Sequence, residues 1–228
     1  ATAAPRSRSR LSMVALKVAV VLGSTRTLGP PNPANVGSRV GLFLADKLRT
    51  RGHSVDVVDP IVEALPLLER PHFAYKTPPP ALQALAERLE AAEAYAMVTP
   101  EYNHSPSPAL LNVLNHFGSS IFGFKPSLIV SYSQGQWGGT RAAQALRPVL
   151  SELGCLPVSA MIHVPEAHAH FDEAGVPDDP KRWTDYANRG VSQLEWWATA
   201  AKNHKLIADP TVGSPALQTS PSQRNAPA

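Results

Sequence analysis

The stretch "LKVAVVLGSTRTLGPPNPANVGSRV", residues 16–40, decides the fold of this chain. Its first eight residues (16–23) are almost continuously apolar, as in a parallel strand that is buried on both faces. The loop that follows is rich in small residues and proline, and from about Asn35 apolar side chains recur along one stripe of a helix. A buried strand, a loop and an amphipathic helix in this order predict the first unit of a doubly wound α/β domain.

The alternation of strand and helix repeats along the rest of the chain. Further strands are expected at residues 53–59, 94–100, 126–133 and 157–164, and further helices at 82–92, 108–117, 141–153 and 183–202. Ser107 is predicted to cap its helix with Pro108 at the first helical position, and Pro148 is expected to kink the helix that contains it. Five strands joined by right-handed crossovers predict a parallel sheet covered by helices on both faces.

The composition excludes several classes of protein. With 228 residues, 43% of them apolar and 17% charged, the chain fits one globular domain. No apolar run approaches the length of a membrane span, and a net charge of +3 is too small and too scattered to indicate binding of nucleic acid. The one cysteine, Cys155, excludes an internal disulfide, suits a reducing compartment and is interpreted as a buried structural residue.

The two ends of the chain differ in composition from the middle. Residues 1–13 carry three arginines and no acidic residue, as in the remnant of an organelle transit segment or in a disordered leader. Residues 205–228 are rich in Pro, Ser, Ala and Gln and are predicted to be a disordered tail. The folded domain is therefore expected at 14–204, in the cytoplasm or, after removal of a transit segment, in an organelle matrix or stroma.

Three loops follow the carboxyl ends of the strands, where ligands bind in such sheets. The first places Gly23, Ser24, Thr25 and Arg26 between a strand and a helix N-terminus. Hydroxyls, backbone N–H groups and the helix dipole favour an anion there, and the arginine adds a charged partner. The loop has neither G-x-G-x-x-G nor G-x-x-x-x-G-K-[ST], and it suits a terminal monophosphate better than a bridging pyrophosphate.

The second and third loops point to a flat ring. In "TPEYNHSPSP" the residues Pro100, Tyr102 and Asn103 supply a rigid turn, an aromatic plate and an amide. In "SYSQGQWGGTRAA" three glycines permit close approach of the backbone to a ligand, and Trp137 adds a second aromatic surface. A seat for one phosphate and two loops around a planar ring match the shape of FMN.

At this point the chain resembles the NADPH-dependent FMN reductase family over roughly residues 17–202. The resemblance rests on "GSTR", "PEYNHS", "LLNVLNHF", "GQWGGTRAA" with "LRPVLSELG", and "FDEAGVPDD". It implies a flavodoxin-like fold with strand order 2-1-3-4-5, FMN held without a covalent bond, NADPH or NADH as reductant, and a homodimer or homotetramer with the flavin near a subunit interface.

The resemblance also implies which residues bind the cofactor. Those expected at the phosphate are Ser24, Arg26, Ser38 and Arg39; those expected around the ring are Pro100, Glu101, Tyr102, Asn103, Ser133, Gln134, Gly135, Gln136, Trp137 and Gly138. The chain departs from the family by inserting "LGPPNPAN" after Thr27. It also departs in the helix after the second loop, where Leu111 and Asn115 replace lysine and aspartate and His116 replaces tryptophan.

The expected function is hydride transfer from NAD(P)H to FMN and then to a small acceptor such as a quinone, a free flavin, a ferric complex or an azo compound. No catalytic acid, base or nucleophile of the protein is expected, because the flavin carries the chemistry. The alternative is a flavodoxin-like scaffold subunit that binds FMN, or only keeps the fold, in a larger assembly. The segment "HAHFDE", residues 168–173, contains metal-ligating side chains but no second ligand group, and no metal site is expected.

Overall fold

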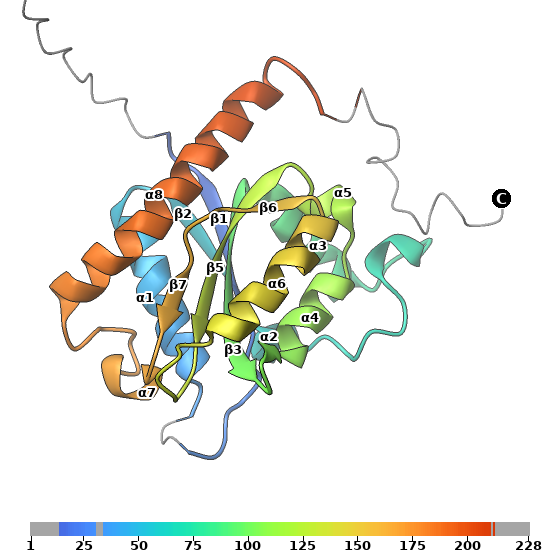
Figure 1. Cartoon of the computed structure of the whole chain (residues 1–228). Helices are drawn as coiled ribbons and strands as arrows, with labels where there is room; N and C mark the ends of the chain where they lie inside the picture. Colours follow the sequence, from blue (N-terminus) through green and yellow to red (C-terminus); the bar gives the residue numbers. More distant parts are fainter. Residues whose placement is uncertain (1–13, 31–33, 211, 213–228) are drawn as a thin grey trace, which may run out of the picture.

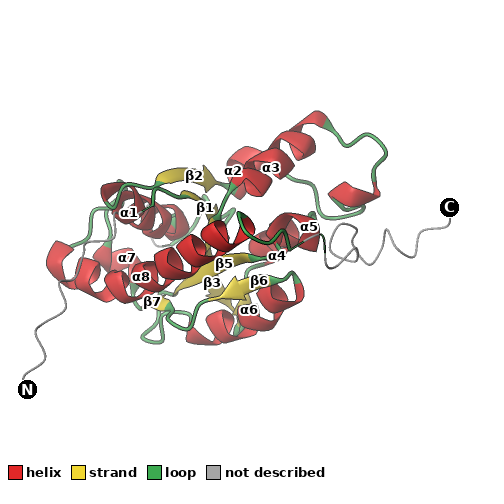
Figure 2. Ribbon diagram, turned by 90° about the horizontal axis from the view of Figure 1, so that it is seen from above, coloured by secondary structure: helices red, strands yellow, loops and turns green. Residues whose placement is uncertain are grey.

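The computed structural model describes residues 14–30, 34–210 and 212, so the predicted leader and most of the predicted tail lie outside the described residues. The described residues form a seven-stranded sheet between two layers of helices (Figures 1 and 2). The strands are β1 (Lys17–Leu22), β2 (Ser54–Val58), β3 (Ala94–Tyr102), β4 (Ser105–Pro106), β5 (Lys125–Tyr132), β6 (Cys155–Pro157) and β7 (Ile162–Val164). The sheet runs in the order β2-β1-β3-β5-β6 with parallel neighbours, which confirms the predicted order.

Two features of the sheet differ from the prediction. β4 is a short antiparallel strand that pairs with the end of β3. The predicted strand at 157–164 is divided into β6 and β7, which both pair with β5. Between the pairs Ser127↔Pro157 and Val130↔Ile162, β5 advances by three residues and its partner by five, so two residues bulge out. The N–H of Ala160, inside this bulge, donates to the Gln193 side chain at 2.8 Å instead of to the sheet.

Helices cover both faces of the sheet. They are α1 (Val36–Thr50), α2 (Pro60–Glu63), α3 (Pro80–Ala91), α4 (Pro108–Asn115), α5 (Ser119–Phe122), α6 (Thr140–Glu152), α7 (Ala167–His170) and α8 (Pro180–Lys205), with a 3₁₀ turn, η1, at His72–Ala74. The cap at Ser107 is confirmed, because its hydroxyl accepts from the N–H of Leu110 at 3.2 Å. α6 continues as one helix through Pro148, whose exposed position leaves the unpaired carbonyl one turn earlier to water.

Apolar side chains alternate along the strands and form a core on each face. On one face Val18, Val20 and Leu22 pack with residues of α1 and α8. On the other face Ala19 and Val21 pack with residues of α3, α4 and α6. Both helical layers thus hold the strands in place, and the loops after β1, β3 and β5 meet at one edge of the sheet. Among the described helices none is both long and apolar enough to span a bilayer.

Candidate functional site

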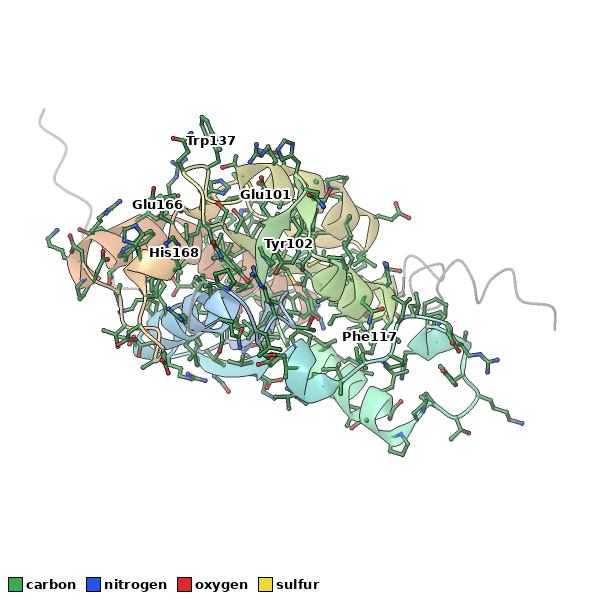
Figure 3. The ribbon with its side chains drawn as sticks, turned by 90° about the horizontal axis from the view of Figure 1, so that it is seen from below. Glu101, Tyr102, Phe117, Trp137, Glu166 and His168 are labelled. Carbon is green, nitrogen blue, oxygen red and sulfur yellow. The ribbon has the colours of Figure 1, made fainter. Side chains whose placement is uncertain are left out.

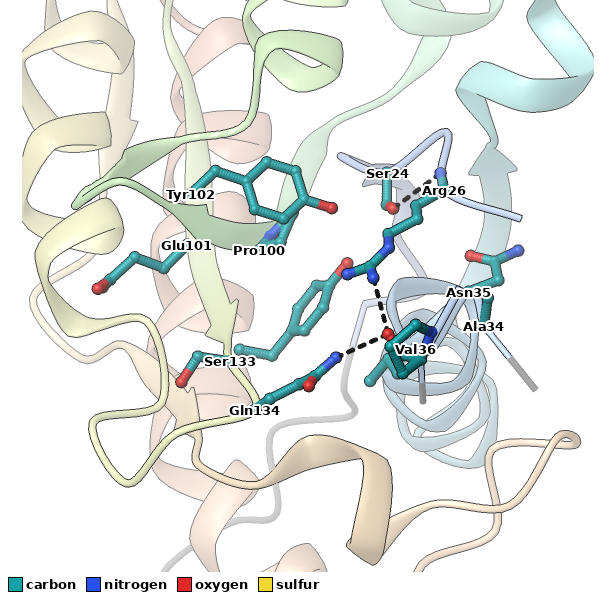
Figure 4. A pocket seen from close by; sticks show the side chains of 12 residues that line it. Ser24, Arg26, Ala34, Asn35, Val36, Pro100, Glu101, Tyr102, Ser133 and Gln134 are labelled. Carbon is teal, nitrogen blue, oxygen red and sulfur yellow. Dashed lines mark hydrogen bonds between the residues drawn. The ribbon is translucent and has the colours of Figure 1, made fainter. Parts of the chain in front are cut away.

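A pocket of about 290 Å³ opens at the carboxyl ends of β1, β3 and β5 (Figure 4). The first loop contributes Ser24 and Arg26, α1 contributes its N-terminal residues, β3 contributes residues 100–102, and the end of β5 contributes residues 132–134. The sequence predicted that these three strand ends form the site. A second hollow of about 530 Å³ lies beside the first and shares Arg26 and Tyr102 with it.

One end of the pocket is built to hold an anion. Ser24 is buried there, and Asn35 caps α1 with its side-chain oxygen 3.3 Å from the N–H of Ser38. The first N–H groups of a helix have no acceptor within the helix, and among the described residues those of Val36 and Gly37 have no other acceptor, so they are available to a ligand. A Cβ at Gly37 would lie 2.3 Å from the hydroxyl oxygen of Tyr132. Glycine at this position therefore lets the start of the helix approach the Tyr132 hydroxyl.

Arg26 extends along the same end of the pocket. Its backbone N–H donates to the Ser24 hydroxyl at 3.2 Å, and its guanidinium donates to the carbonyl of Pro30 at 2.7 Å. The Gln134 amide donates to the same carbonyl at 3.2 Å (Figure 4). Two donors from different loops thus converge on one oxygen atom. An anionic oxygen near this position would meet the same two donors, one of them charged.

The second loop forms a hairpin at the other end of the pocket. Asn103 and His104 both have positive φ, 51° and 64°, and connect β3 to β4 as a two-residue turn. Glu101 accepts from the N–H groups of Arg141 and Ala142 at 3.1 and 3.3 Å and forms an ion pair with the Arg141 guanidinium. Burial alone would raise the pKa of Glu101, but these bonds outweigh burial and lower the pKa below its ordinary value. Glu101 is therefore an anion that binds the N-terminus of α6.

The third loop, residues 133–139, lies against β5 and β7. Gly138 and Gly139 have φ of 58° and 77°, and a Cβ on either would lie 2.8–2.9 Å from the backbone or side chain beneath it. Only glycine permits this close approach. Trp137 is 62% exposed at the tip of the loop, as Figure 3 shows from the side of the strand ends. In the part of the chain that is described, the N–H groups of Gly135, Gln136 and Trp137 have no acceptor.

The structure brings half of the predicted residues together. Those that line the pocket are Ser24, Arg26, Pro100, Glu101, Tyr102, Ser133 and Gln134; those outside its lining are Ser38, Arg39, Asn103, Gly135, Gln136, Trp137 and Gly138. Arg39 is buried and its guanidinium donates to the carbonyl of Phe171 at 3.2 Å. Asn35 is the N-cap of α1, so Ser38 and Arg39 belong to the helix itself and not to the loop inserted after Thr27.

Sequence reasoning missed five residues of the pocket lining, of which Asn35 and Tyr132 contribute polar side chains. Asn35 was expected only as the start of a helix, although an asparagine at an N-cap before "VGS" is itself a signal for a helix end that faces the strand edge. Tyr132 is the last residue of β5 and is buried at 6% exposure. Burial raises the pKa of the Tyr132 hydroxyl, which keeps it a protonated donor at neutral pH. No pattern in the sequence shows that this hydroxyl reaches the start of α1.

The residues present fit a phosphorylated planar ligand. The anion-binding end offers a serine hydroxyl, a tyrosine hydroxyl, helix N–H groups and an arginine. Gly37 leaves open the space that a side chain would fill. The other end offers the exposed ring of Tyr102. Residues 135–137 of the third loop lie outside the lining, and their N–H groups have no acceptor among the described residues. In the described residues no group of three or more His, Cys, Asp and Glu side chains is placed to hold a metal, and His170 of the "HAHFDE" segment pairs with Asp178 at 2.8 Å.

Comparison with known proteins agrees with this geometry. The sequence pattern of the NADPH-dependent FMN reductase family matches residues 16–169. An NAD(P)H-dependent FMN reductase of Pseudomonas aeruginosa is 29% identical over 187 residues, which cover 80% of this chain and 95% of the relative. A 2-hydroxy-1,4-benzoquinone reductase of a Burkholderia species is 30% identical over 167 residues, which cover 72% of this chain and 83% of the relative. The solved structure of a flavoenzyme NAD(P)H:(acceptor) oxidoreductase from Paracoccus denitrificans shares the fold, with a TM-score of 0.61 and 20% identity over 81% of this chain and 98% of that one.

Proposed function

The chain belongs to the NADPH-dependent FMN reductase family, and from this premise we propose how its pocket serves an FMN-dependent NAD(P)H oxidoreductase. The proposal rests on the composition of one pocket, which has hydroxyl groups and an arginine at one end and the aromatic ring of Tyr102 at the other. A monophosphate and a flat heterocycle on one short chain satisfy both halves. FMN, when bound, supplies the two-electron chemistry.

The protein's own groups bind and orient the cofactor in this proposal. Ser24, the first N–H groups of α1 and the guanidinium of Arg26 bind the phosphate, and Arg26 exchanges the Pro30 carbonyl for it. Tyr102 covers the ring from the hairpin, while Glu101 fixes the hairpin to α6 without touching the ring. The N–H groups at residues 135–137 bind the polar edge of the ring and stabilise negative charge there.

The second hollow supports a place for the other substrates. It lies beside the pocket, opens widely and is lined by Thr25, Ser107 and the shared Tyr102. We infer that the nicotinamide and the acceptor enter from this side in turn. A quinone is the acceptor that we favour, because one relative that the chain covers well is named as a benzoquinone reductase. Sharing of one exposed face predicts ping-pong kinetics.

Two measurements test the function itself. The purified protein should be yellow and should release FMN rather than FAD on acid treatment, which chromatography of the released flavin decides. It should then oxidise NADPH in the presence of a quinone, with parallel lines in double-reciprocal plots. A yellow protein without turnover would support the scaffold alternative, and intersecting lines would contradict a shared face.

Assembly and location are separate proposals. We propose a homodimer or homotetramer; the exposed Trp196 and Trp197, whose rings lie 4.7 Å apart on α8, are a surface that a second copy can cover. Sedimentation equilibrium tests this, and a monomer at micromolar concentration would contradict it. A cytoplasmic location, or an organelle matrix or stroma after removal of a transit segment, is tested by cell fractionation.

A further inference from the structure

Ser131 and His163 form a hydrogen-bonded pair directly beneath the third loop. They are register partners on β5 and β7, and the Ser131 Oγ lies 2.8 Å from His163 Nδ1. The same Oγ lies 2.8 Å from the carbonyl oxygen of Gly138. A hydroxyl has one proton, and a carbonyl oxygen can only accept. Ser131 therefore donates to Gly138 and accepts from a protonated Nδ1, which fixes the tautomer of a neutral His163.

A serine and a histidine at this separation also suggest a nucleophile and its base. Three observations argue against that function. Ser131 is fully buried, and its hydroxyl already donates to the Gly138 carbonyl. The backbone of Gly139 also covers the serine, because a Cβ added at Gly139 would lie 2.9 Å from the Cβ of Ser131. No substrate carbonyl can reach the hydroxyl, so the pair acts on the loop above it.

The loop itself shows a division between its two kinds of polar group. Its carbonyls are bonded to the protein: Gly135 accepts from the Ser133 hydroxyl at 2.9 Å, Trp137 from the Thr140 hydroxyl at 2.7 Å, and Gly138 from Ser131. The N–H groups of residues 135–137 have no acceptor within the described residues. Carbonyls turned toward the protein leave N–H groups for a ligand, as in backbone nests that bind electronegative atoms.

We propose that Ser131 and His163 are positioning residues for the flavin ring: by holding the Gly138 carbonyl they keep the third loop in the conformation whose free N–H groups bind the polar edge of the ring. This inference rests on the proposed function of the pocket. Burial lowers the pKa of His163, so the imidazole stays neutral at pH 7 and adds no charge next to the flavin.

The experiment compares four variants of the full chain as apoprotein, titrated with FMN and with riboflavin. Ser131→Ala should weaken binding of both flavins by the same factor, about five- to tenfold, because the loop contacts the ring that the two share. His163→Val should weaken binding of both flavins about two- to fivefold. In this variant the Ser131 hydroxyl still donates to the Gly138 carbonyl, but it no longer accepts a hydrogen bond from His163. His163→Asn keeps an N–H donor and should restore most of this loss.

Ser127→Ala is the matched control. Ser127 is a buried serine of the same strand, its hydroxyl has no hydrogen-bond partner among the residues that the structure describes, and it lies away from the loop, so flavin affinity should not change. Amide hydrogen exchange of residues 134–139 in the apoprotein gives a readout without flavin; it should quicken in Ser131→Ala and not in Ser127→Ala. Unchanged flavin affinity in Ser131→Ala, a loss for FMN alone, or an equal loss in Ser127→Ala would overturn the proposal. Wild-type protein that binds neither flavin would instead contradict the proposed function.

Discussion

The two ends of the sheet differ in whether their polar groups have partners within the protein. At the amino end the buried charged groups are paired: Glu195 of α8 binds both Arg51 and His53, and the buried ammonium of Lys125 donates to the carbonyls of Leu89 and Glu90. At the carboxyl end, within the described residues, helix and loop N–H groups lack acceptors and the hydroxyls face a pocket. Folding alone pairs the charged groups at the amino end, whereas the donors at the carboxyl end need a ligand to accept their hydrogen bonds.

Cavity size does not distinguish the two ends. The amino end has a hollow of about 400 Å³, walled by apolar side chains such as Leu156 and Trp197, and the carboxyl end has the two hollows of about 290 and 530 Å³. The hollow at the amino end offers a ligand few directed hydrogen bonds. The 290 Å³ pocket is the candidate site because polar side chains from three strand ends line it. The comparison predicts that changes at the amino end alter stability and changes at the carboxyl end alter flavin affinity.

The largest effect is expected from Glu195→Ala at the amino end. The substitution removes the carboxylate that binds Arg51 and the buried His53, although Arg51 keeps its hydrogen bonds to Asn188 and Ser192. Loss of one member of a buried ion pair costs about 3–5 kcal/mol of the free energy of unfolding. FMN affinity of the folded fraction should not change. Urea denaturation and flavin titration check both statements, and Glu195→Gln, which keeps the shape and one acceptor, should lose less. A loss of flavin affinity without a loss of stability would contradict the statement that the amino end contributes to stability and not to flavin binding.

Arg26→Ala at the carboxyl end should have the next largest effect. A hydrogen bond to a charged group contributes about 1.5–3 kcal/mol, so FMN should bind roughly ten- to several-hundred-fold more weakly. The lower part of this range is expected, because Arg26 gives up the Pro30 carbonyl when it binds the phosphate. Riboflavin has no phosphate, so its affinity should barely change, and Arg26→Lys should recover part of the loss. Equal losses for both flavins would mean that Arg26 supports the fold and not the phosphate.

Lys125 should give the amino end a pH dependence of stability. Burial, with help from nearby Lys205, lowers the pKa of Lys125 to about 8, whereas in the unfolded chain the lysine holds its proton to about pH 10. Between these values the unfolded state binds more protons, so the free energy of unfolding should rise with pH by about 1 kcal/mol per unit from this residue. Lys125→Met should lack the rise. Burial raises the pKa of the Cys155 thiol to about 12, which acts in the opposite direction in both proteins, and the charge of Lys125 opposes this shift. The difference between the two proteins is the quantity to measure, and it contains both the titration of Lys125 and its effect on Cys155.

The smallest effect is expected from truncation after Lys205. This residue ends α8 at the amino end of the sheet, and the next two residues, Leu206 and Ile207, are more than 80% exposed. Little apolar area is lost, so flavin content and affinity should stay as in the full chain, and the denaturation midpoint should shift only slightly. Loss of flavin from the shortened protein would show that the tail contributes to the site or to its assembly.

Much of the fold follows from local spacing in the sequence. The apolar runs at β1, β3 and β5 and the stripe of α1 are visible in segments of six to fifteen residues, and Ser107 before Pro108 marks its own helix start. The division of the last strand was missed, because the N–H of Ala160 finds its acceptor on Gln193, 33 residues later in the chain. A bulge of this kind has no periodic signature.

The doubly wound sheet and the three loops that meet at its carboxyl edge follow from the sequence, because strand and helix periodicity and strand-end rules act over short segments. The strand order was implied by the family resemblance. The role of each loop residue depends on the tertiary structure. Glu101 binds the end of α6 across 40 residues, Gly37 admits the hydroxyl of Tyr132, and Ser131 meets His163 across 32 residues. Each of these contacts joins residues that are far apart in the chain and adjacent in space. Local sequence patterns do not show which distant residues become neighbours.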